Sequence, residues 1–345
     1  MLNNPHKLLV YCPNWVGDVV MATPTIRCLG RHFPHSSLYA IIRSYASGVL
    51  KNSPWLDGII ACDDKSLTGI KKLINEIKKI QPETAILLPN TLRSALLLRA
   101  AGITNLFGYK INHRSLLLSG GPSPIREGRK IVPRPMTEYY LEICRWLQLP
   151  PLETSRPELF FSAQDQDRAN HLLSRYNISE DDLVVGMNPG AKFGSSKCWP
   201  PQYFARLAEM IESEMSARIL LFVGPGEEEI AQEIVQASSA DIINTAPDRI
   251  GLELLKPMIQ RCQLLITNDT GPRHFAVALD VPVVVVMGST DPRYTASNLE
   301  KTMVLQRKEL DCVPCHIKTC PYQHECMRSI HPEEVFAAAE KMLNR

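Results

Sequence analysis

The chain has 345 residues, of which 45% are hydrophobic and 21% charged, and its net charge is +2. These values are typical of a globular protein and exclude a disordered chain, and the length favours two domains. No apolar run approaches the roughly 20 residues that a bilayer span needs, and residues 1–7 lead into an apolar segment rather than a signal peptide, so we expect a cytoplasmic protein.

In the first half of the chain, short apolar segments alternate with helical periods. This alternation is typical of a parallel sheet covered by helices. Residues 119–134 are rich in glycine and proline and are predicted to form a long loop, which is either mobile or functional. Strands are predicted over residues 8–11, 38–42, 58–61, 85–88 and 105–109, and helices over residues 19–32, 68–80 and 92–100.

The same alternation returns after two predicted helices over residues 136–147 and 165–176. We therefore expect two doubly wound, Rossmann-like α/β domains, at residues 1–165 and 166–330, with ligands in a cleft at the carboxyl ends of their strands. Residues 331–345 are predicted to hold a helix that crosses back to the first domain. In the second domain, strands are predicted over residues 183–187, 218–223, 242–244, 264–267 and 283–287, and helices over residues 203–214, 227–237, 252–260 and 273–278.

Charge is distributed unevenly along the chain. Residues 1–150 hold 19 Lys and Arg against 9 Asp and Glu, and no acidic residue lies between Glu83 and Glu127. Each basic residue taken alone fits a solvated face, but the long window without acids favours an anionic partner. A phosphorylated acceptor, a membrane surface and a nucleic acid all fit this charge. The candidate acceptor-binding residues in this window are Arg93, Arg114 and Arg126.

Asp18 follows the first predicted strand and lies near the start of the next helix. One interpretation is an N-cap, whose carboxylate accepts backbone N–H bonds. The other is a general base at the carboxyl edge of the sheet, placed to take a proton from an acceptor hydroxyl. Composition favours the cap, whereas position favours the base.

Two strand-to-helix segments in the second half are suited to phosphate binding. The strand at residues 183–187 leads into a turn of small residues that includes Asn188, Gly190 and Lys197, and the strand at 264–267 is followed by a helix opened by Gly271 and Pro272. Such turns direct backbone N–H groups and a fixed positive charge at an anion. Together the two segments predict a site for a nucleotide diphosphate.

Several residues near these segments allow two interpretations. Asp269 fits either ligand binding or a loop or cap, Gly271 fits a turn, and His274 fits a core histidine bonded to a carbonyl. Glu227 fits either a contact to ribose hydroxyls or an acidic first helical turn. The chain lacks a G-x-G-x-x-G after its first strand and a P-loop, which argues against a nicotinamide dehydrogenase and a P-loop kinase.

Four cysteines lie close together near the end of the chain, with C-x2-C-x4-C-x5-C spacing. A structural zinc site is possible but not favoured, since only the first spacing is typical of zinc sites. The alternatives are reduced structural thiols or disulfides, and in each case the cluster stiffens a loop. These residues are Cys312, Cys315, Cys320 and Cys326.

Several motifs resemble those of the bacterial ADP-heptose:lipopolysaccharide heptosyltransferases of glycosyltransferase family 9, and most closely the branch that adds the second heptose. The likeness extends over nearly the whole chain, in order. The motifs lie at residues 15–24, 188–191, 197–201, 268–276 and 288–293, with a C-terminal signature at residues 311–315, 319–321 and 326.

The resemblance implies a GT-B fold with an acceptor domain followed by an ADP-heptose domain. It also implies a metal-independent, inverting transfer of L-glycero-D-manno-heptose to the first heptose of the lipopolysaccharide inner core, without a cofactor. Asp18 matches the family's base and Lys197 its phosphate-contacting lysine, while Asp269, Thr270, Gly271 and His274 match its nucleotide motif. The implied partners are ADP-heptose, a heptosyl-Kdo2-lipid A type acceptor and, peripherally, the inner face of the inner membrane, and no nucleic acid.

Two alternatives from other classes remain. One is a different sugar-nucleotide enzyme of the same fold, such as another family 9 heptosyltransferase or a UDP-sugar epimerase. The other is a non-catalytic binder of anionic glycolipid or nucleic acid, suggested by the basic first half.

Overall fold

Two parallel sheets, each with helices on both faces, form the architecture of the computed structural model, which describes residues 4–64 and 66–344. The chain divides into two units, the first ending at Phe160 and the second beginning at Phe161, and Arg293–Ser297 groups with the first unit. The division lies five residues before the predicted boundary, because the whole of helix α5 (Ala163–Arg175) belongs to the second unit.

The first sheet has the order β3-β2-β1-β4-β5, and all neighbouring strands are parallel. The chain moves outward from β1 to β3 and then returns to the other side of β1, so the strand order reverses between β1 and β4. In open α/β sheets, ligands bind at the carboxyl ends of the strands at such a reversal. The strands are β1 (Lys7–Tyr11), β2 (Ser37–Arg43), β3 (Gly58–Cys62), β4 (Thr84–Leu87) and β5 (Asn105–Gly108).

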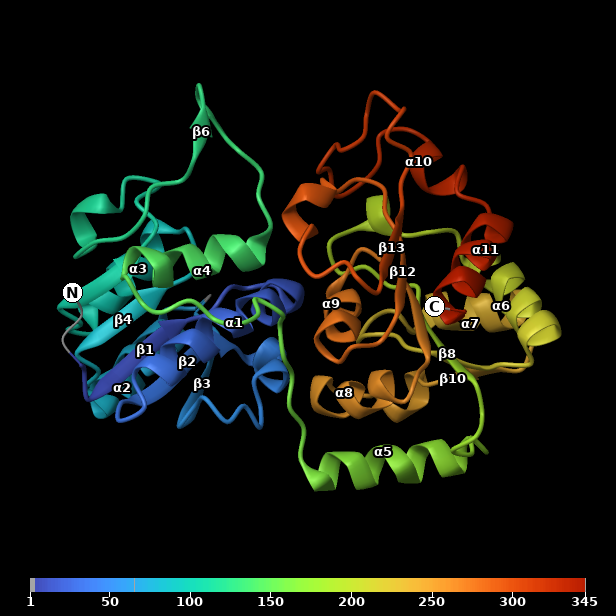
Figure 1. Ribbon diagram of the computed structural model, residues 1–345, viewed down its shortest axis with the longest axis horizontal. Helices are drawn as coiled ribbons and strands as arrows, with labels where there is room; N and C mark the ends of the chain where they lie inside the picture. Colours follow the sequence, from blue (N-terminus) through green and yellow to red (C-terminus); the bar gives the residue numbers. More distant parts are fainter. Residues whose placement is uncertain (1–3, 65, 345) are drawn as a thin grey trace. The chain divides into compact units, whose positions relative to one another are not determined.

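Helices cover both faces of this sheet (Figure 1). On one face, α1 (Val16–His32) packs against α4 (Met136–Trp146). On the other, α2 (Leu67–Ile80) and α3 (Leu92–Ala100) contact each other and share a buried apolar cluster with alternate strand residues. The predicted doubly wound domain is therefore confirmed.

Helix α1 contains Pro24, which lacks the N–H that would donate to the carbonyl of Val20. The hydroxyl of Thr23 donates to that carbonyl instead, at 2.8 Å. Since the freed carbonyl is satisfied, the helix continues through the proline and packs along α4.

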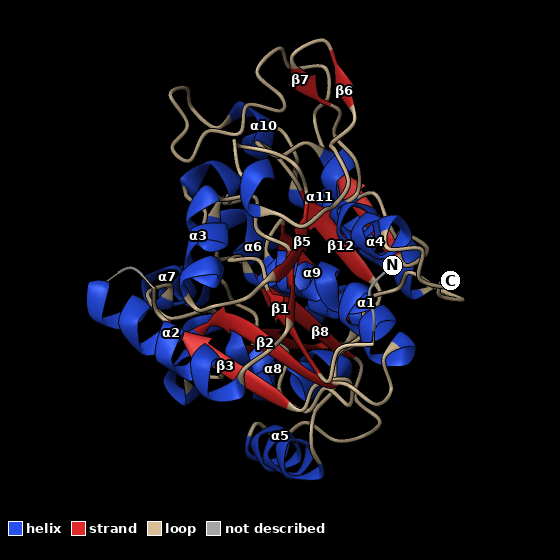
Figure 2. Cartoon of the chain, turned by 90° about the vertical axis from the view of Figure 1, so that its left-hand side faces the viewer, coloured by secondary structure: helices blue, strands red, loops and turns tan. Residues whose placement is uncertain are grey.

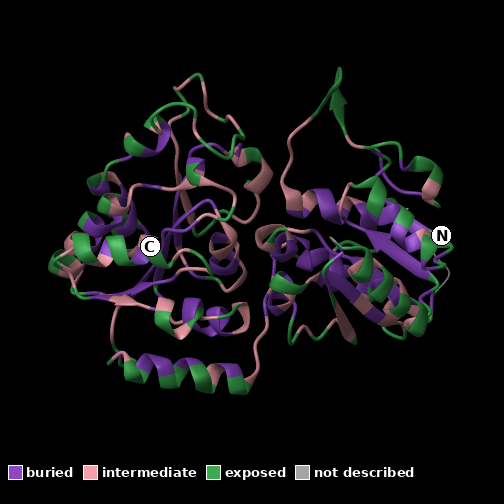
Figure 3. Cartoon of the chain, turned by 180° about the vertical axis from the view of Figure 1, so that it is seen from behind, coloured by how far each residue is buried: buried purple, intermediate pink, exposed green. Residues whose placement is uncertain are grey.

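The second sheet has the order β10-β9-β8-β11-β12-β13, again wholly parallel. Its strand order reverses between β8 and β11. The central strands β8, β11 and β12 are wholly buried, as the purple strands of Figure 3 show, which agrees with their apolar sequences. The strands are β8 (Val184–Asn188), β9 (Arg218–Leu221), β10 (Ile242–Asn244), β11 (Leu264–Asn268), β12 (Val283–Val286) and β13 (Thr302–Leu305).

The helices of the second unit also divide between two faces. One face carries α6 (Pro201–Met215), α7 (Glu228–Ala237) and α11 (Pro332–Leu343), which share one apolar cluster. The other carries α5, α8 (Leu252–Gln260) and α9 (Gly271–Ala278), which contact one another in series. Helix α11, which we expected to cross back to the first domain, instead packs against α6, β11 and β12, because its apolar face completes this cluster.

The short elements β13, α10 (Glu325–Arg328), β6 (Arg126–Glu127) and β7 (Lys130–Ile131) were not predicted from the sequence. Strand β13 has only partly buried residues, and helix α10 has a single turn, so neither gives a strong periodic signal. The predicted loop over residues 119–134 contains the antiparallel hairpin of β6 and β7. Among the described helices, none is both long and apolar enough to span a membrane.

Candidate active site

Asp18 lies at the strand reversal of the first sheet. It follows β1 and is the third residue of α1, whose N-cap position is Trp15. The interpretation of Asp18 as the N-cap is therefore wrong, because the helix begins about one turn earlier than predicted. Its carboxylate is partly exposed at the carboxyl edge of the sheet, which is the position expected of a base.

The partner of Asp18 comes from α4, a helix distant in the sequence. The hydroxyl of Tyr140 donates to Asp18 Oδ1 at 3.0 Å. Burial, and then the negative charge of Asp18, raise the pKa of Tyr140 well above its usual value, so the hydroxyl keeps its proton. Tyr140 therefore fixes the Asp18 carboxylate through a donated hydrogen bond, and no sequence motif marks this residue.

A polar network holds the loop between β1 and α1. Arg43, at the end of β2, donates from Nε to Asn14 Oδ1 at 3.0 Å and pairs with the buried carboxylate of Asp64. Tyr11 donates to the same carboxylate at 3.2 Å, and Tyr45 donates to the carbonyl of Asn14. Three strand ends thus support the loop that leads to Asp18.

The three candidate acceptor arginines have different surroundings. Arg93 is exposed in the first turn of α3, and its charge lowers the pKa of Tyr11 at the end of β1, although burial dominates and raises that pKa to about 12. Arg126 is exposed on the hairpin. Both side chains are accessible to a ligand.

Arg114 is fully buried, which corrects its prediction as an acceptor contact. Its guanidinium donates to the carbonyl of Tyr109 at 2.8 Å, to Asn90 Oδ1 at 3.3 Å and to the carbonyl of Pro89. Burial lowers its pKa to about 10, so it is still charged at neutral pH. Arg114 therefore ties the loops after β4 and β5 together, and charge counting alone does not reveal its burial.

The strand reversal of the second sheet brings together the ends of β8, β9 and β11. Asn188, the last residue of β8, accepts hydrogen bonds from Thr270 at 3.1 Å and Thr267 at 3.3 Å, and donates to the carbonyl of Phe222 at 2.8 Å. Asn188 is 5% exposed, so its amide joins three strand ends. Asn188 therefore positions its neighbours at this sheet edge, and its part in ligand binding stays a prediction.

Lys197 and Arg273 both pair with the buried Asp269. Lys197 Nζ lies 2.9 Å from Asp269 Oδ2, and Arg273 Nη1 lies 2.7 Å from Oδ1. Although burial raises the pKa of Asp269, the charges of Arg273 and Lys197 hold it well below its usual range. The cluster holds two positive charges and one negative charge, and therefore favours an anion.

The N-terminus of α9 adjoins this cluster. Thr270 is the N-cap residue of α9. Among the described residues its side chain makes no capping bond, because its hydroxyl donates to Asn188 instead. The first-turn N–H groups of Gly271 and Arg273 point along the helix axis and favour an anion, whereas Pro272 between them has no N–H. The predicted grouping of Lys197, Asp269, Thr270 and Gly271 at one sheet edge therefore agrees with their positions in the structure.

His274 lies in the same helix and is partly buried. Burial, and then the positive charge of Arg273, lower its pKa to about 3. The imidazole is therefore neutral at physiological pH and adds no charge to the cluster.

Gly190 and Glu227 approach each other at the ends of β8 and β9. A Cβ on Gly190 would lie 1.9 Å from Glu227 Oε2, so a larger residue here would displace the Glu227 side chain. The Glu227 carboxylate accepts from the N–H of Gly224 at 2.8 Å, and the residue is the N-cap of α7. Gly190 and Glu227, both predicted site residues, thus lie at the same sheet edge as Asn188. The hydrogen bond between Gly224 and Glu227 also closes the turn that precedes α7.

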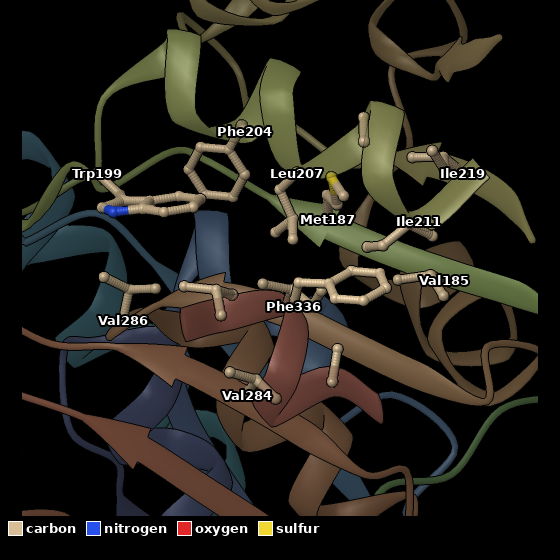
Figure 4. Packing of buried hydrophobic residues seen from close by; sticks show 14 of the residues in the cluster. Val185, Met187, Trp199, Phe204, Leu207, Ile211, Ile219, Val284, Val286 and Phe336 are labelled. Carbon is tan, nitrogen blue, oxygen red and sulfur yellow. The ribbon is translucent and has the colours of Figure 1, made fainter. Parts of the chain in front are cut away.

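Trp199 anchors the loop that carries Lys197. Its side chain is 1% exposed and packs against Phe204 in the apolar cluster of the second unit (Figure 4). Its indole N–H donates to the carbonyl of Ile330 at 2.8 Å, and its backbone N–H donates to Asn268 Oδ1 at 3.1 Å. Trp199 thus fixes the loop that carries Lys197 through its packing and its hydrogen bonds.

The four C-terminal cysteines line one small cavity together with Ser196 and Ser289. Burial, and then the neighbouring thiols, raise the pKa of Cys326 to about 11. All ten cysteines lie in the described part of the chain, and none is disulfide-bonded there. Nor do the described residues include three His, Cys, Asp or Glu side chains arranged to hold a metal ion.

The cysteine segment contacts the lysine loop directly. The N–H of Ser196 donates to the carbonyl of Lys318 at 3.1 Å, and its hydroxyl donates to the carbonyl of Ile317. A Cβ on Gly194 would lie 2.3 Å from the Lys318 carbonyl oxygen, so the two segments are tightly packed. The segment therefore supports the loop that positions Lys197.

Comparison with known proteins identifies the class of this protein. The family model of glycosyltransferase family 9 (heptosyltransferase) matches residues 70–325. The protein is therefore a glycosyltransferase, and it belongs to family 9, the heptosyltransferases.

The relatives and solved structures agree with this assignment. Lipooligosaccharide heptosyltransferase 2 of Campylobacter jejuni is 25% identical over 97% of this chain and 99% of its own, and lipopolysaccharide heptosyltransferase 2 of Escherichia coli K12 is 26% identical over 87% and 88%. The structure of E. coli ADP-heptose heptosyltransferase II matches with a TM-score of 0.80 and 25% identity over 98% of both chains.

A family 9 glycosyltransferase from Veillonella parvula matches with a TM-score of 0.85 and 22% identity over 99% of both chains, which supports the fold alone. The expectation of a GT-B type architecture is confirmed by these structures.

Proposed function

We propose that this protein transfers L-glycero-D-manno-heptose from ADP-heptose to the first heptose of the lipopolysaccharide inner core. The observation that carries the proposal is the full-length similarity to E. coli ADP-heptose lps heptosyltransferase II, whose name includes ADP-heptose. The C. jejuni relative carries the same kind of name at similar identity.

In the proposed reaction, Asp18 is the general base. The acceptor hydroxyl oxygen attacks the anomeric carbon of the heptose, its proton passes to Asp18, and the bond between that carbon and the ADP oxygen breaks. Attack opposite the leaving group inverts the anomeric configuration. The hydrogen bond from Tyr140 to Oδ1 supports this role, because it fixes the orientation of the carboxylate.

The leaving ADP gains negative charge, and we assign its stabilisation to the second unit. Lys197, the N–H groups at the start of α9 and the charge of Arg273 supply positive potential at one place. Asp269 orients the lysine, and Glu227 is a candidate partner for the ribose hydroxyls. In this proposal these groups stabilise the leaving group without a metal ion or cofactor.

The acceptor is proposed to contact the first unit. Arg93 is exposed in the first turn of α3, near the strand reversal of the first sheet, and Arg126 is exposed on the hairpin. Both suit the phosphates of a heptosyl-Kdo2-lipid A type molecule. Since such an acceptor is anchored in a membrane, we propose that the protein works peripherally at the inner face of the inner membrane.

A donor and acceptor assay tests this proposal. The protein is incubated with ADP-heptose or UDP-N-acetylglucosamine, each with a core acceptor that carries one heptose or none. We expect product only with ADP-heptose and the mono-heptosylated acceptor. Transfer to the heptose-free acceptor would assign the protein to another branch of the family, and turnover of the UDP-sugar would contradict the proposal.

A further inference from the structure

The β6–β7 hairpin of the first unit is exposed over its whole length. Residues 125–131 are all exposed, and they form two short antiparallel strands in which Arg126 pairs with Ile131 and Glu127 with Lys130. Figure 2 shows β6 and β7 side by side at the end of a loop, and Figure 3 shows this tip in the colour of exposed residues. A two-stranded hairpin of this kind buries too little surface to be explained as part of the core.

The base of the hairpin is fixed to the sheet, whereas its tip is not buried. The N–H of Gly108 at the end of β5 donates to the carbonyl of Gly120, and the N–H of Lys110 donates to that of Pro122. A Cβ on Gly121 would lie 1.8 Å from the carbonyl oxygen of Gly108, so this contact requires glycine. The fold therefore presents the tip from a fixed base.

The exposed tip combines apolar and basic side chains. Ile125, which precedes β6, is 59% exposed, and Ile131, the last residue of β7, is 37% exposed. Arg129 and Lys130 follow Gly128, which opens the two-residue turn at φ +60°. Together with Arg126 they give the tip three basic residues against one acidic residue. A soluble anion explains the basic residues but leaves the two isoleucines in water.

We propose that the β6–β7 hairpin docks the protein on an anionic lipid bilayer, with Ile125 and Ile131 entering the interface between headgroups and acyl chains. Basic side chains close to an anionic membrane bind its surface charge, and apolar side chains bind its interfacial region. This inference rests on the proposed function in one respect only, namely that the proposed acceptor is anchored in a bilayer. Vesicle binding requires no catalysis, so the two proposals can fail separately.

The test is co-sedimentation of the full chain with vesicles of phosphatidylcholine alone or mixed with phosphatidylglycerol. The first variant, Ile125→Ser/Ile131→Ser, removes the apolar side chains. The second, Arg129→Ser/Lys130→Ser, removes charge and leaves Arg126, a candidate acceptor residue, unchanged. The matched controls are Leu67→Ser and Lys71→Ser/Lys72→Ser, exposed changes on α2 of the same unit.

We expect wild type to bind the anionic vesicles and not those of phosphatidylcholine alone. The charge variant should bind about 30-fold more weakly, since each basic side chain near such a surface contributes about 1 kcal/mol. The apolar variant should lose about tenfold, and the controls should bind as wild type does. Equal binding by the hairpin variants and wild type, or equal loss in the controls, would overturn the proposal.

A soluble polyanion and a change of acceptor complete the test. Binding of a single-stranded DNA oligonucleotide as tightly as anionic vesicles, with the same loss in the charge variant and none in the apolar variant, would contradict bilayer docking. In transfer assays, both hairpin variants should raise the KM for acceptor embedded in vesicles and leave the KM for a lipid-free acceptor fragment unchanged. An equal rise for both acceptors would assign the hairpin to acceptor recognition instead.

Discussion

One aspartate lies near the strand reversal of each sheet, and the surroundings of the two differ. Asp18 follows β1 at the first strand reversal and accepts a hydrogen bond from the neutral hydroxyl of Tyr140. Asp269 follows β11 at the second reversal, where Lys197 and Arg273 hold its pKa far below the usual range. The same residue type therefore has different surroundings at the two strand reversals.

The difference shows which carboxylate suits a base. A general base must accept a proton near neutral pH, and a carboxylate bound by two cations resists protonation. Asp269 is therefore suited to orienting Lys197 rather than to accepting a proton, and Asp18 is the base that we propose. Five substitutions test this contrast.

Asp18→Asn should have the largest effect, because it keeps the size of the side chain and removes its basicity. We expect kcat to fall by about 10³-fold or more. Binding of ADP, measured by calorimetry, should be unchanged, since the nucleotide is assigned to the second unit. A variant that retains wild-type activity would make Asp18 dispensable and favour a non-catalytic binder.

Lys197→Ala should reduce both donor binding and transfer. Removing one electrostatic contact to the leaving group costs about 10²- to 10³-fold in kcat, and ADP affinity should fall as well. Lys192→Ala, a change of an exposed lysine on the same loop, is the control and should behave as wild type. Unchanged ADP affinity in Lys197→Ala would contradict the phosphate assignment.

Arg93→Glu should act on the acceptor alone. Reversing this exposed charge should raise the acceptor KM about ten- to hundredfold and leave the KM for ADP-heptose unchanged, because a charge-assisted contact contributes about 1.5–3 kcal/mol. Lys72→Glu on α2 serves as the control. Equal changes in both constants would refute the assignment.

Tyr140→Phe should reduce kcat about five- to tenfold, because one hydrogen bond to a charged group is lost. Loss of a donor to the carboxylate also raises the pKa of Asp18, so the acidic limb of the kcat/KM profile should shift to higher pH. Tyr139→Phe removes a neighbouring hydroxyl that bonds to Asn90 and should leave this limb unchanged. If the acidic limb of the kcat/KM profile does not shift in Tyr140→Phe, the role of Tyr140 is purely structural.

The smallest effect concerns His274 and the stability of the second unit. Its pKa is lowered from 6.5 to about 3 on folding, so protonation favours the unfolded chain and stability is lost as pH falls below about 6.5. Between pH 6 and 4, wild type should lose up to about 1.4 kcal/mol per pH unit more than His274→Gln. The free energy of unfolding is measured by denaturant titration at each pH. If it changes equally with pH in wild type and His274→Gln, His274 is not held neutral.

The sequence predicts the fold well because both sheets consist of buried parallel strands. Apolar segments such as those of β8 and β12 are continuous and separated by helical periods, so their type is unambiguous. The path of α11 could not be predicted, because an apolar helix face does not specify which sheet it covers.

The candidate site could be predicted only where its residues lie in turns near strand ends. Lys197, Asp269 and Gly271 lie in such turns, and the topology brings the turns together. Tyr140 could not be found in this way, because it lies in α4, 122 residues from Asp18. Arg114 was misread because burial depends on the packing of β4 and β5, which a count of charges does not contain.

A single-turnover assay tests the central claim most directly. Excess enzyme, ADP-heptose and mono-heptosylated core acceptor are mixed, and ADP and the product are followed for wild type and for Asp18→Asn. We predict equimolar ADP and an acceptor that has gained one heptose in wild type, with almost none of either from Asp18→Asn. Equal product from both proteins, or ADP formed without a heptosylated product, would contradict the account.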